Sequence, residues 1–300
     1  NYNLSINNNN LMISCGAKPA LYLAFKYLTT NGSKWLIPNP YWTSYPDMIE
    51  SLGGSSIILN SKVENNWEFD LNQLENNFKN NRVNGLILCN PNNPTGICYS
   101  DEYIEKIINL CIDFDKYLIV DEVYLPLTNA NTSYDIANKL NYNKIIIISS
   151  FSKYWALPGW RVGWILSNDK ITNDLVKLQS CIFTCAPTAG MELANNLLKD
   201  TLDKKDKIDL TILDKSKVVL ENLFIEKDWK LIRNNNRSMY IFPVNSDPNY
   251  DIDNFINKLL ENGLGVISGN AFGYKNSIRI TLPNDIETLD RMVKIIFKCI

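Results

Sequence analysis

The sequence predicts an α/β fold in which a mostly parallel sheet forms a large domain and a smaller α+β domain follows. Apolar segments of strand periodicity alternate with segments of helical periodicity over residues 1–200, which is typical of parallel strands joined by helices. This regular alternation stops after residue 200. The chain has 300 residues, of which 45% are hydrophobic, and this is enough for two unequal domains with buried cores. We therefore expect one domain over 1–200 and a second over 201–300.

Apolar spacing and turn residues predict the elements of the first domain. Helical spacing begins directly after Cys15-Gly16, and Gly53-Gly54 ends the next helical segment. The apolar run 145–148 is too short to cross a membrane and indicates a buried strand. The expected helices span 17–29, 43–52, 70–80, 101–113, 168–181 and 187–200. The expected strands span 34–38, 56–59, 85–90, 117–120, 145–149 and 162–166.

The second domain is expected to begin with a long charged helix near residues 205–226. After this helix the pattern changes to α+β, and no internal repeat is found. The remaining expected strands span 229–233, 239–244 and 277–281, and the remaining expected helices span 251–262 and 285–298.

The composition excludes several kinds of chemistry. The chain contains no histidine, which removes Ser-His-Asp and Cys-His nucleophile systems and histidine metal sites. Its 7 cysteines include no CxxC pair, so we expect no metal site, and buried free thiols in a reducing, cytoplasmic compartment. The 30 basic and 32 acidic residues give a net charge of −2, which does not favour nucleic acid or an anionic membrane as partner.

Polar motifs follow the predicted strands at the points where open α/β sheets bind ligands. NPNNPTG closes the strand 85–90, DEVY follows 117–120, and SSFSK followed by PGWR ends the strand 145–149. The strand 277–281 contains one arginine, Arg279, between apolar residues. Because a buried guanidinium requires an anionic partner, Arg279 is expected to bind an anion or to pair with a local acid.

Taken in order, these motifs resemble those of the class I/II aminotransferases, which are pyridoxal-phosphate enzymes of fold type I. The segments SCGAKPALYLAF, NPYWTSYPDMIESLGG and SIRITL extend the resemblance, which is strongest to the aspartate aminotransferases of bacteria and archaea. The resemblance implies pyridoxal 5'-phosphate as cofactor, an amino acid and a 2-oxo acid as substrates, and a homodimer. It also implies the roles of the residues that follow.

Three residues match the catalytic positions of this family. Lys153 matches the lysine that forms a Schiff base with the cofactor; the alternative is a solvated surface lysine. Asp121 matches the carboxylate that keeps the pyridine nitrogen protonated, so that the ring accepts electrons; the alternative is a helix cap or an ion pair. Tyr124 matches the tyrosine that hydrogen-bonds the ring's phenolic oxygen; the alternative is a core tyrosine.

A phosphate site is expected at the start of the helix 17–29. The free N–H groups at Gly16, Ala17 and Lys18 and the helix dipole attract an anion. Ser150 and Arg161 match the family's hydroxyl and guanidinium ligands of the same phosphate, and arginine can bind it through two hydrogen bonds.

Four residues are expected around the substrate. Trp42 matches the aromatic side chain that stacks on the pyridine ring, and Asn93 matches an asparagine near both the phenolic oxygen and the substrate carboxylate. Arg279 matches the arginine that holds the α-carboxylate. Lys18 matches a lysine near the distal carboxylate in the aspartate-specific branch, which favours a dicarboxylic substrate. The alternatives are a core tryptophan, a turn asparagine and an exposed lysine.

The chain also departs from the family pattern. The family has a longer N-terminal region, and because this chain opens at Asn1 without methionine we expect that upstream residues are missing. The family's Gly-Ala-Phe-Tyr is represented by Arg237-Ser238-Met239-Tyr240. The alternatives to a transaminase are a β-lyase or a decarboxylase of the same fold, a ligand-sensing domain, and an inactive truncated product.

Overall fold

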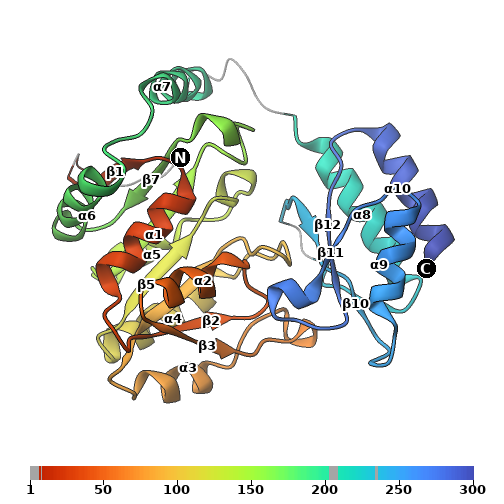
Figure 1. Ribbon diagram of the computed structural model, residues 1–300, viewed down its shortest axis with the longest axis horizontal. Helices are drawn as coiled ribbons and strands as arrows, with labels where there is room; N and C mark the ends of the chain where they lie inside the picture. Colours follow the sequence, from red (N-terminus) through yellow and green to blue (C-terminus); the bar gives the residue numbers. More distant parts are fainter. Residues whose placement is uncertain (1–6, 8, 203–208, 234–235) are drawn as a thin grey trace.

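The computed structural model describes residues 7, 9–202, 209–233 and 236–300 (Figure 1). Within these residues a seven-stranded sheet has the order β1-β7-β6-β5-β4-β2-β3. Strands β3, β2, β4, β5 and β6 are parallel, and β7 is antiparallel to both β6 and β1, so the prediction of a mostly parallel sheet is confirmed. The strands are β1 (Leu11–Ser14), β2 (Lys34–Pro38), β3 (Ser55–Leu59), β4 (Val83–Cys89), β5 (Tyr117–Asp121), β6 (Ile145–Ser150) and β7 (Gly163–Leu166).

Helices cover both faces of this sheet and bury its central strands, as parallel sheets require. Because successive side chains of a strand point to opposite faces, Ile119 packs into one apolar core while Leu118 and Val120 pack into another. The core at Ile119 is closed by α1 (Ala17–Leu28), α2 (Ser44–Ser51) and α6 (Asp169–Ile182). The opposite core is closed by α3 (Leu71–Phe78), α4 (Asp101–Asp113) and α5 (Ser133–Lys139).

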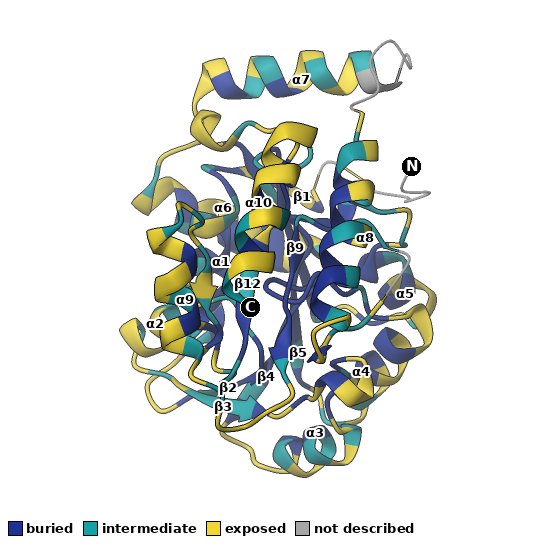
Figure 2. Cartoon of the chain, turned by 90° about the vertical axis from the view of Figure 1, so that its right-hand side faces the viewer, coloured by how far each residue is buried: buried dark blue, intermediate teal, exposed yellow. Residues whose placement is uncertain are grey.

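The remaining elements form a second group beside the large sheet, drawn in turquoise and blue in Figure 1. This group has its own apolar core, and Figure 2 shows α10 with exposed residues on its outer side. Its helices are α8 (Thr211–Ile225), α9 (Ile252–Glu261) and α10 (Ile286–Cys299). Its strands are β8 (Trp229–Lys230), β9 (Tyr240–Ile241), β10 (Val244–Asn245), β11 (Ile267–Ser268) and β12 (Ile278–Thr281). Helix α7 (Thr188–Leu202) packs on the loop after β6 through Ala194.

Several boundaries differ from the predictions. The expected strand 239–244 is wrong as a single element, because Pro243 cannot donate a ladder hydrogen bond and separates β9 from β10. The expected strand 229–233 ends at Lys230. The helix expected over 205–226 begins at Thr211, and residues 203–208 lie outside the described part of the chain. Strands β1 and β11 and helix α5 were not predicted.

Candidate active site

A cavity of about 490 Å³ lies where β4, β5 and β6 end beside the second group of elements. It is lined by every residue that the sequence predicts for the site except Gly16, which contacts the lining residue Arg161. The predicted residues in its wall are Ala17, Lys18, Trp42, Asn93, Asp121, Tyr124, Ser150, Lys153, Arg161 and Arg279. The structure therefore brings together side chains that are separated by up to 262 positions in the sequence, from Ala17 to Arg279.

Asp121 ends β5 and lies on the floor of this cavity, with 4% of its surface exposed. Burial raises the pKa of its carboxyl group from 3.8 to about 6, although hydrogen bonds and the Lys153 ammonium oppose this shift. The hydrogen bonds come from the Tyr45 hydroxyl at 2.9 Å and from the Val123 N–H at 3.3 Å. The carboxylate is thus fixed in direction and ionised at neutral pH, as a partner of a protonated ring nitrogen must be.

Tyr124 follows β5 by three residues and presents its hydroxyl to the same cavity. The Asn93 amide nitrogen donates to this hydroxyl at 3.4 Å, and the hydroxyl of Tyr240 lies 3.1 Å away. Burial raises the pKa of Tyr124 well above 10, so the phenol is protonated at neutral pH. The arrangement therefore holds a neutral hydrogen-bond donor close to Lys153.

Lys153 lies in the turn after β6 and is half-buried. Its Nζ is 5.4 Å from the centre of the Tyr124 ring, and among the described residues it has no ion pair or hydrogen bond. Once it has lost its proton, a half-buried lysine amine with no ion pair among the described residues can form a covalent bond in the cavity.

The amino end of α1 and Arg161 form one side of the cavity. Gly16 precedes the helix with φ 93°, and no side chain caps the first N–H groups of the helix. Arg161 donates to the Cys15 carbonyl at 3.1 Å and to the Pro158 carbonyl at 2.7 Å. A Cβ atom at position 16 would lie 2.4 Å from the guanidinium, so glycine permits this close approach. Uncapped N–H groups, a guanidinium and the nearby Ser150 hydroxyl are a suitable donor set for a phosphate.

Trp42 and Lys18 lie at another part of the wall. The Lys18 ammonium is 5.0 Å from the centre of the Trp42 ring, which is a cation–π distance. The ring of Trp42 also meets the ring of Tyr45 edge-on, with centres 5.3 Å apart. Lys18 is exposed and has no carboxylate partner among the described residues, so its charge faces the solvent side of the cavity.

Arg279 enters the cavity from β12. One guanidinium nitrogen donates to the Asn93 side-chain oxygen at 3.0 Å, and the Nε atom is buried with no hydrogen-bond partner. Within the described chain no carboxylate pairs with this guanidinium, which contradicts the alternative that Arg279 pairs with a local acid. The guanidinium thus lines the cavity with no carboxylate partner in the described chain.

The lining or supporting residues that were not singled out from the sequence include Tyr45, Tyr240 and Cys89. Tyr45 and Tyr240 bond to predicted residues, and Cys89 is a buried thiol whose pKa is raised by burial. A signal existed for the two tyrosines, because both lie inside segments that carry the family resemblance. All seven cysteines are free, but the expectation that they are buried is confirmed only for Cys89 and Cys111. Cys15, Cys98 and Cys299 are half-buried, and Cys181 and Cys185 are exposed.

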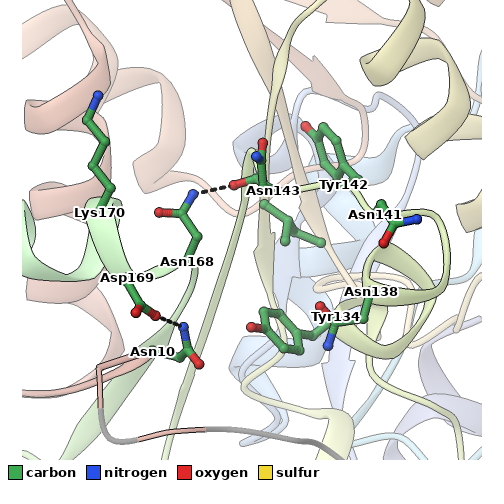
Figure 3. A pocket seen from close by; sticks show the side chains of 10 residues that line it. Asn10, Tyr134, Asn138, Asn141, Tyr142, Asn143, Asn168, Asp169 and Lys170 are labelled. Carbon is green, nitrogen blue, oxygen red and sulfur yellow. Dashed lines mark hydrogen bonds between the residues drawn. The ribbon is translucent and has the colours of Figure 1, made fainter.

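A second hollow of about 440 Å³ lies at the amino end of β6 (Figure 3). Half of its lining residues are asparagines. Figure 3 shows the Asn168 amide pointing to the Asn143 carbonyl, at 2.5 Å. Asn10 similarly bonds to Asp169. Across the described ranges, no three His, Cys, Asp or Glu side chains cluster as metal ligands.

No helix in the described part of the chain is long and apolar enough to cross a membrane.

Known proteins resemble the chain over nearly its whole length. The family model described as aminotransferase class I and II matches residues 1–296. An aspartate aminotransferase of Bacillus sp. (strain YM-2) is 27% identical over 302 residues, covering 95% of this chain and 76% of that protein. A (5-formylfuran-3-yl)methyl phosphate transaminase of Methanocaldococcus jannaschii is 28% identical over 293 residues, covering 96% and 74%. The crystal structure of a Thermotoga maritima aspartate aminotransferase has a TM-score of 0.86 at 25% identity, covering 98% and 76%.

Proposed function

We propose that this chain, which belongs to the class I and II aminotransferases, transfers an amino group from an aspartate-like amino acid to a 2-oxo acid. As a member of this family it is a pyridoxal-phosphate-dependent transferase of fold type I. The aspartate-like donor is the finer part of the proposal, because relatives that cover almost the same length are named for different substrates.

The residues around the cavity fit pyridoxal phosphate. The uncapped amino end of α1 with Arg161 and Ser150 provides donors for the phosphate, and Trp42 provides a flat aromatic face. Asp121 provides a buried carboxylate for the ring nitrogen. When bound, the cofactor supplies an electron sink for the charge that develops at the substrate α-carbon.

Lys153 is the proposed catalytic base. Its Nζ has no ion pair among the described residues and is 5.4 Å from the Tyr124 ring, so it can hold the cofactor aldehyde covalently. With the cofactor bound, the Lys153 Nζ would be the base that takes the proton from the substrate α-carbon and holds it for return. Asp121 would hold the proton of the ring nitrogen, and Tyr124 would donate a hydrogen bond to the phenolic oxygen.

Arg279 and Lys18 are proposed to bind the two carboxylates of the substrate. The Arg279 guanidinium lines the cavity without a carboxylate partner among the described residues, and this observation carries the carboxylate site. A fixed α-carboxylate orients the substrate bond that is to be broken. The exposed Lys18 ammonium, held over the Trp42 ring at 5.0 Å, supplies a second cation for a distal carboxylate.

Absorbance spectra test the first half-reaction. The protein is mixed with pyridoxal phosphate, and aspartate is then added without any oxo acid. We expect a visible band that forms and is then bleached while oxaloacetate is released. Lys153→Ala should lose the band, whereas Lys170→Ala, which removes an exposed lysine from the second hollow, should keep it. Release of ammonia or carbon dioxide without oxo-acid turnover would instead identify a β-lyase or a decarboxylase.

Lys18→Gln tests the substrate preference, with Lys26→Gln on the same helix as control. We expect Lys18→Gln to lower aspartate turnover relative to alanine turnover by about fivefold, because an ion pair at an exposed lysine is worth up to about 1 kcal/mol. An unchanged ratio would refute the dicarboxylate preference. The homodimer, the cytoplasmic location and the domain division at residue 200 are further parts of this proposal, which gel filtration, fractionation and limited proteolysis can test.

A further inference from the structure

Tyr240 lies where the second group of elements meets the large sheet. It is in β9, which pairs with β12, and Thr281 of β12 lies opposite Tyr240. Its side chain lines the cavity and is 7% exposed. Its hydroxyl is 3.1 Å from that of Tyr124, and its ring lies 4.5 Å from the Arg279 guanidinium carbon. One side chain thus touches both a residue proposed for the cofactor and a residue proposed for the substrate.

The chemistry of Arg279 determines how the protons around Tyr124 are arranged. A guanidinium can only donate, so the Asn93 group that faces Arg279 at 3.0 Å is the carbonyl oxygen. The Asn93 NH₂ group must then face Tyr124, where it donates to the hydroxyl oxygen at 3.4 Å. One lone pair of that oxygen is occupied in this way. The remaining question is which of the two tyrosines donates in the bond between their hydroxyl groups.

We propose that Tyr240 is a positioning residue whose hydroxyl donates to the Tyr124 oxygen, which leaves the Tyr124 proton free for the cavity, and whose ring supports the Arg279 guanidinium. This inference rests on the proposed function, in which Tyr124 donates to the phenolic oxygen of the cofactor. If Tyr124 donated to Tyr240, it would have no proton left for the cofactor. With Tyr240 as donor, the Tyr124 oxygen accepts two hydrogen bonds. Accepting these bonds strengthens the hydrogen bond that the Tyr124 hydroxyl itself donates.

Other charged or titratable groups also face Tyr124, and they define what the test must hold constant. They come from each element that packs around it, namely Cys89 of β4, Asp121 of β5, Lys153 of the turn after β6 and Arg279 of β12. A change that removes only the Tyr240 hydroxyl leaves all four in place. Tyr240→Phe is therefore the appropriate variant.

The first test is a pH titration of the visible absorbance of the protein with bound pyridoxal phosphate. The deprotonated form of the bound cofactor carries negative charge on the phenolic oxygen, which the Tyr124 donor stabilises. Accepting a hydrogen bond from Tyr240 should strengthen the bond that Tyr124 donates to the phenolic oxygen by roughly 10–30%. We therefore expect Tyr240→Phe to move the midpoint of the titration upward by about 0.3 pH units. The matched control is Tyr103→Phe, because Tyr103 is also 7% exposed but donates to the Phe69 carbonyl outside the cavity. An unchanged midpoint in Tyr240→Phe would overturn the proposal, as would an equal shift in the control.

The second test separates the ring of Tyr240 from its hydroxyl. Phenylalanine keeps the cation–π contact with Arg279, so Tyr240→Phe should leave KM for the amino acid within about twofold. Tyr240→Leu removes the ring and should raise KM by about two- to fivefold, in addition to the shift of the midpoint. A purely structural role would not produce this separation, and an unchanged KM in Tyr240→Leu would refute the support of Arg279.

The third test does not depend on the cofactor. In apoprotein that carries carbon-13 at the tyrosine Cζ atoms, the Tyr124 resonance, assigned through its loss in Tyr124→Phe, should shift in Tyr240→Phe and stay constant in Tyr103→Phe. A constant Tyr124 resonance would refute the hydrogen bond between the two tyrosines. A shifted resonance in a protein that binds no pyridoxal phosphate would support the hydrogen bond and refute the proposed function instead.

Discussion

Glu122, the residue after Asp121, gives a prediction about stability that can be worked out from the structure. Its carboxylate is 1% exposed and ties the end of β5 to the start of α5. It accepts a hydrogen bond from the Thr132 hydroxyl at 2.6 Å and another from the Ser133 N–H at 2.7 Å. Burial raises the pKa of this carboxyl group from 4.5 to about 7, although these hydrogen bonds oppose the shift.

The raised pKa makes the native state less stable as the pH rises. In the unfolded chain Glu122 ionises near pH 4.5, and in the folded chain it ionises near pH 7. The folded state therefore holds more protons than the unfolded state between these pH values. The contribution of protonated Glu122 to the free energy of unfolding is complete below pH 4.5 and is lost as the pH rises to about 7. The difference of about 2.5 pH units corresponds to about 3 kcal/mol.

Glu122→Gln removes the charge and keeps the shape of the side chain. Its amide oxygen can accept from the Ser133 N–H, and its amide nitrogen can donate to the Thr132 hydroxyl oxygen. We expect the free energy of unfolding of the variant, relative to wild type, to rise by about 3 kcal/mol between pH 4.5 and pH 8.

Urea denaturation at a series of pH values measures this difference. Glu105→Gln is the control, because Glu105 is an exposed carboxylate on α4. The control should show a constant difference from wild type across the series. The reasoning is refuted if the difference between wild type and Glu122→Gln also stays constant with pH, because no proton would then be linked to folding at this carboxyl group.

Three further predictions concern the cavity. Tyr45→Phe removes a hydrogen bond that lowers the pKa of Asp121, so the pKa of Asp121 should rise by about one unit. In a fluorescence titration the variant should therefore bind pyridoxal phosphate more weakly at pH 6 than at pH 8. An equal loss of affinity at both pH values would contradict this reasoning. Arg279→Lys removes the bidentate hydrogen bonding that arginine offers to a carboxylate. It should raise KM for the amino acid about 10- to 100-fold, with a smaller change in kcat. An unchanged KM would count against Arg279 as the binding site of the substrate carboxylate. Gly16→Ala places a Cβ atom 2.4 Å from the Arg161 guanidinium and should weaken cofactor binding about tenfold, whereas equal affinity would show that this side of the cavity does not hold the phosphate.

The sequence is informative about the cavity wherever a side chain lies at the end of a buried strand. Asp121 and Ser150 end β5 and β6, and parallel strands bring their carboxyl ends to one edge of the sheet. Arg279 was also predictable, because one charge within an apolar strand requires a partner. Periodicity places these side chains at the edge of the sheet, whereas the roles expected for them come from the family resemblance.

The residues that the sequence did not single out depend on contacts between distant segments. Tyr45 is in α2 and reaches Asp121 only because α2 packs on the sheet face below the cavity. Strand β1 was not predicted because only two of its four side chains are buried and it follows an asparagine-rich stretch. Helix α5 has seven residues and begins at Ser133, whose N–H is held by a carboxylate eleven positions earlier in the chain. Local periodicity cannot supply contacts of this kind.

The geometry also separates the two tasks of the site. The groups proposed for the cofactor project from the sheet and its following turns, whereas Arg279 and Tyr240 project from β12 and β9 in the second group of elements. Asn93 joins these two sets, because its oxygen accepts from Arg279 and its nitrogen donates to Tyr124. A shift of β9 and β12 would therefore move the substrate carboxylate and alter the hydrogen bonds to Tyr124 at the same time, while the surroundings of Asp121 and Lys153 stayed unchanged.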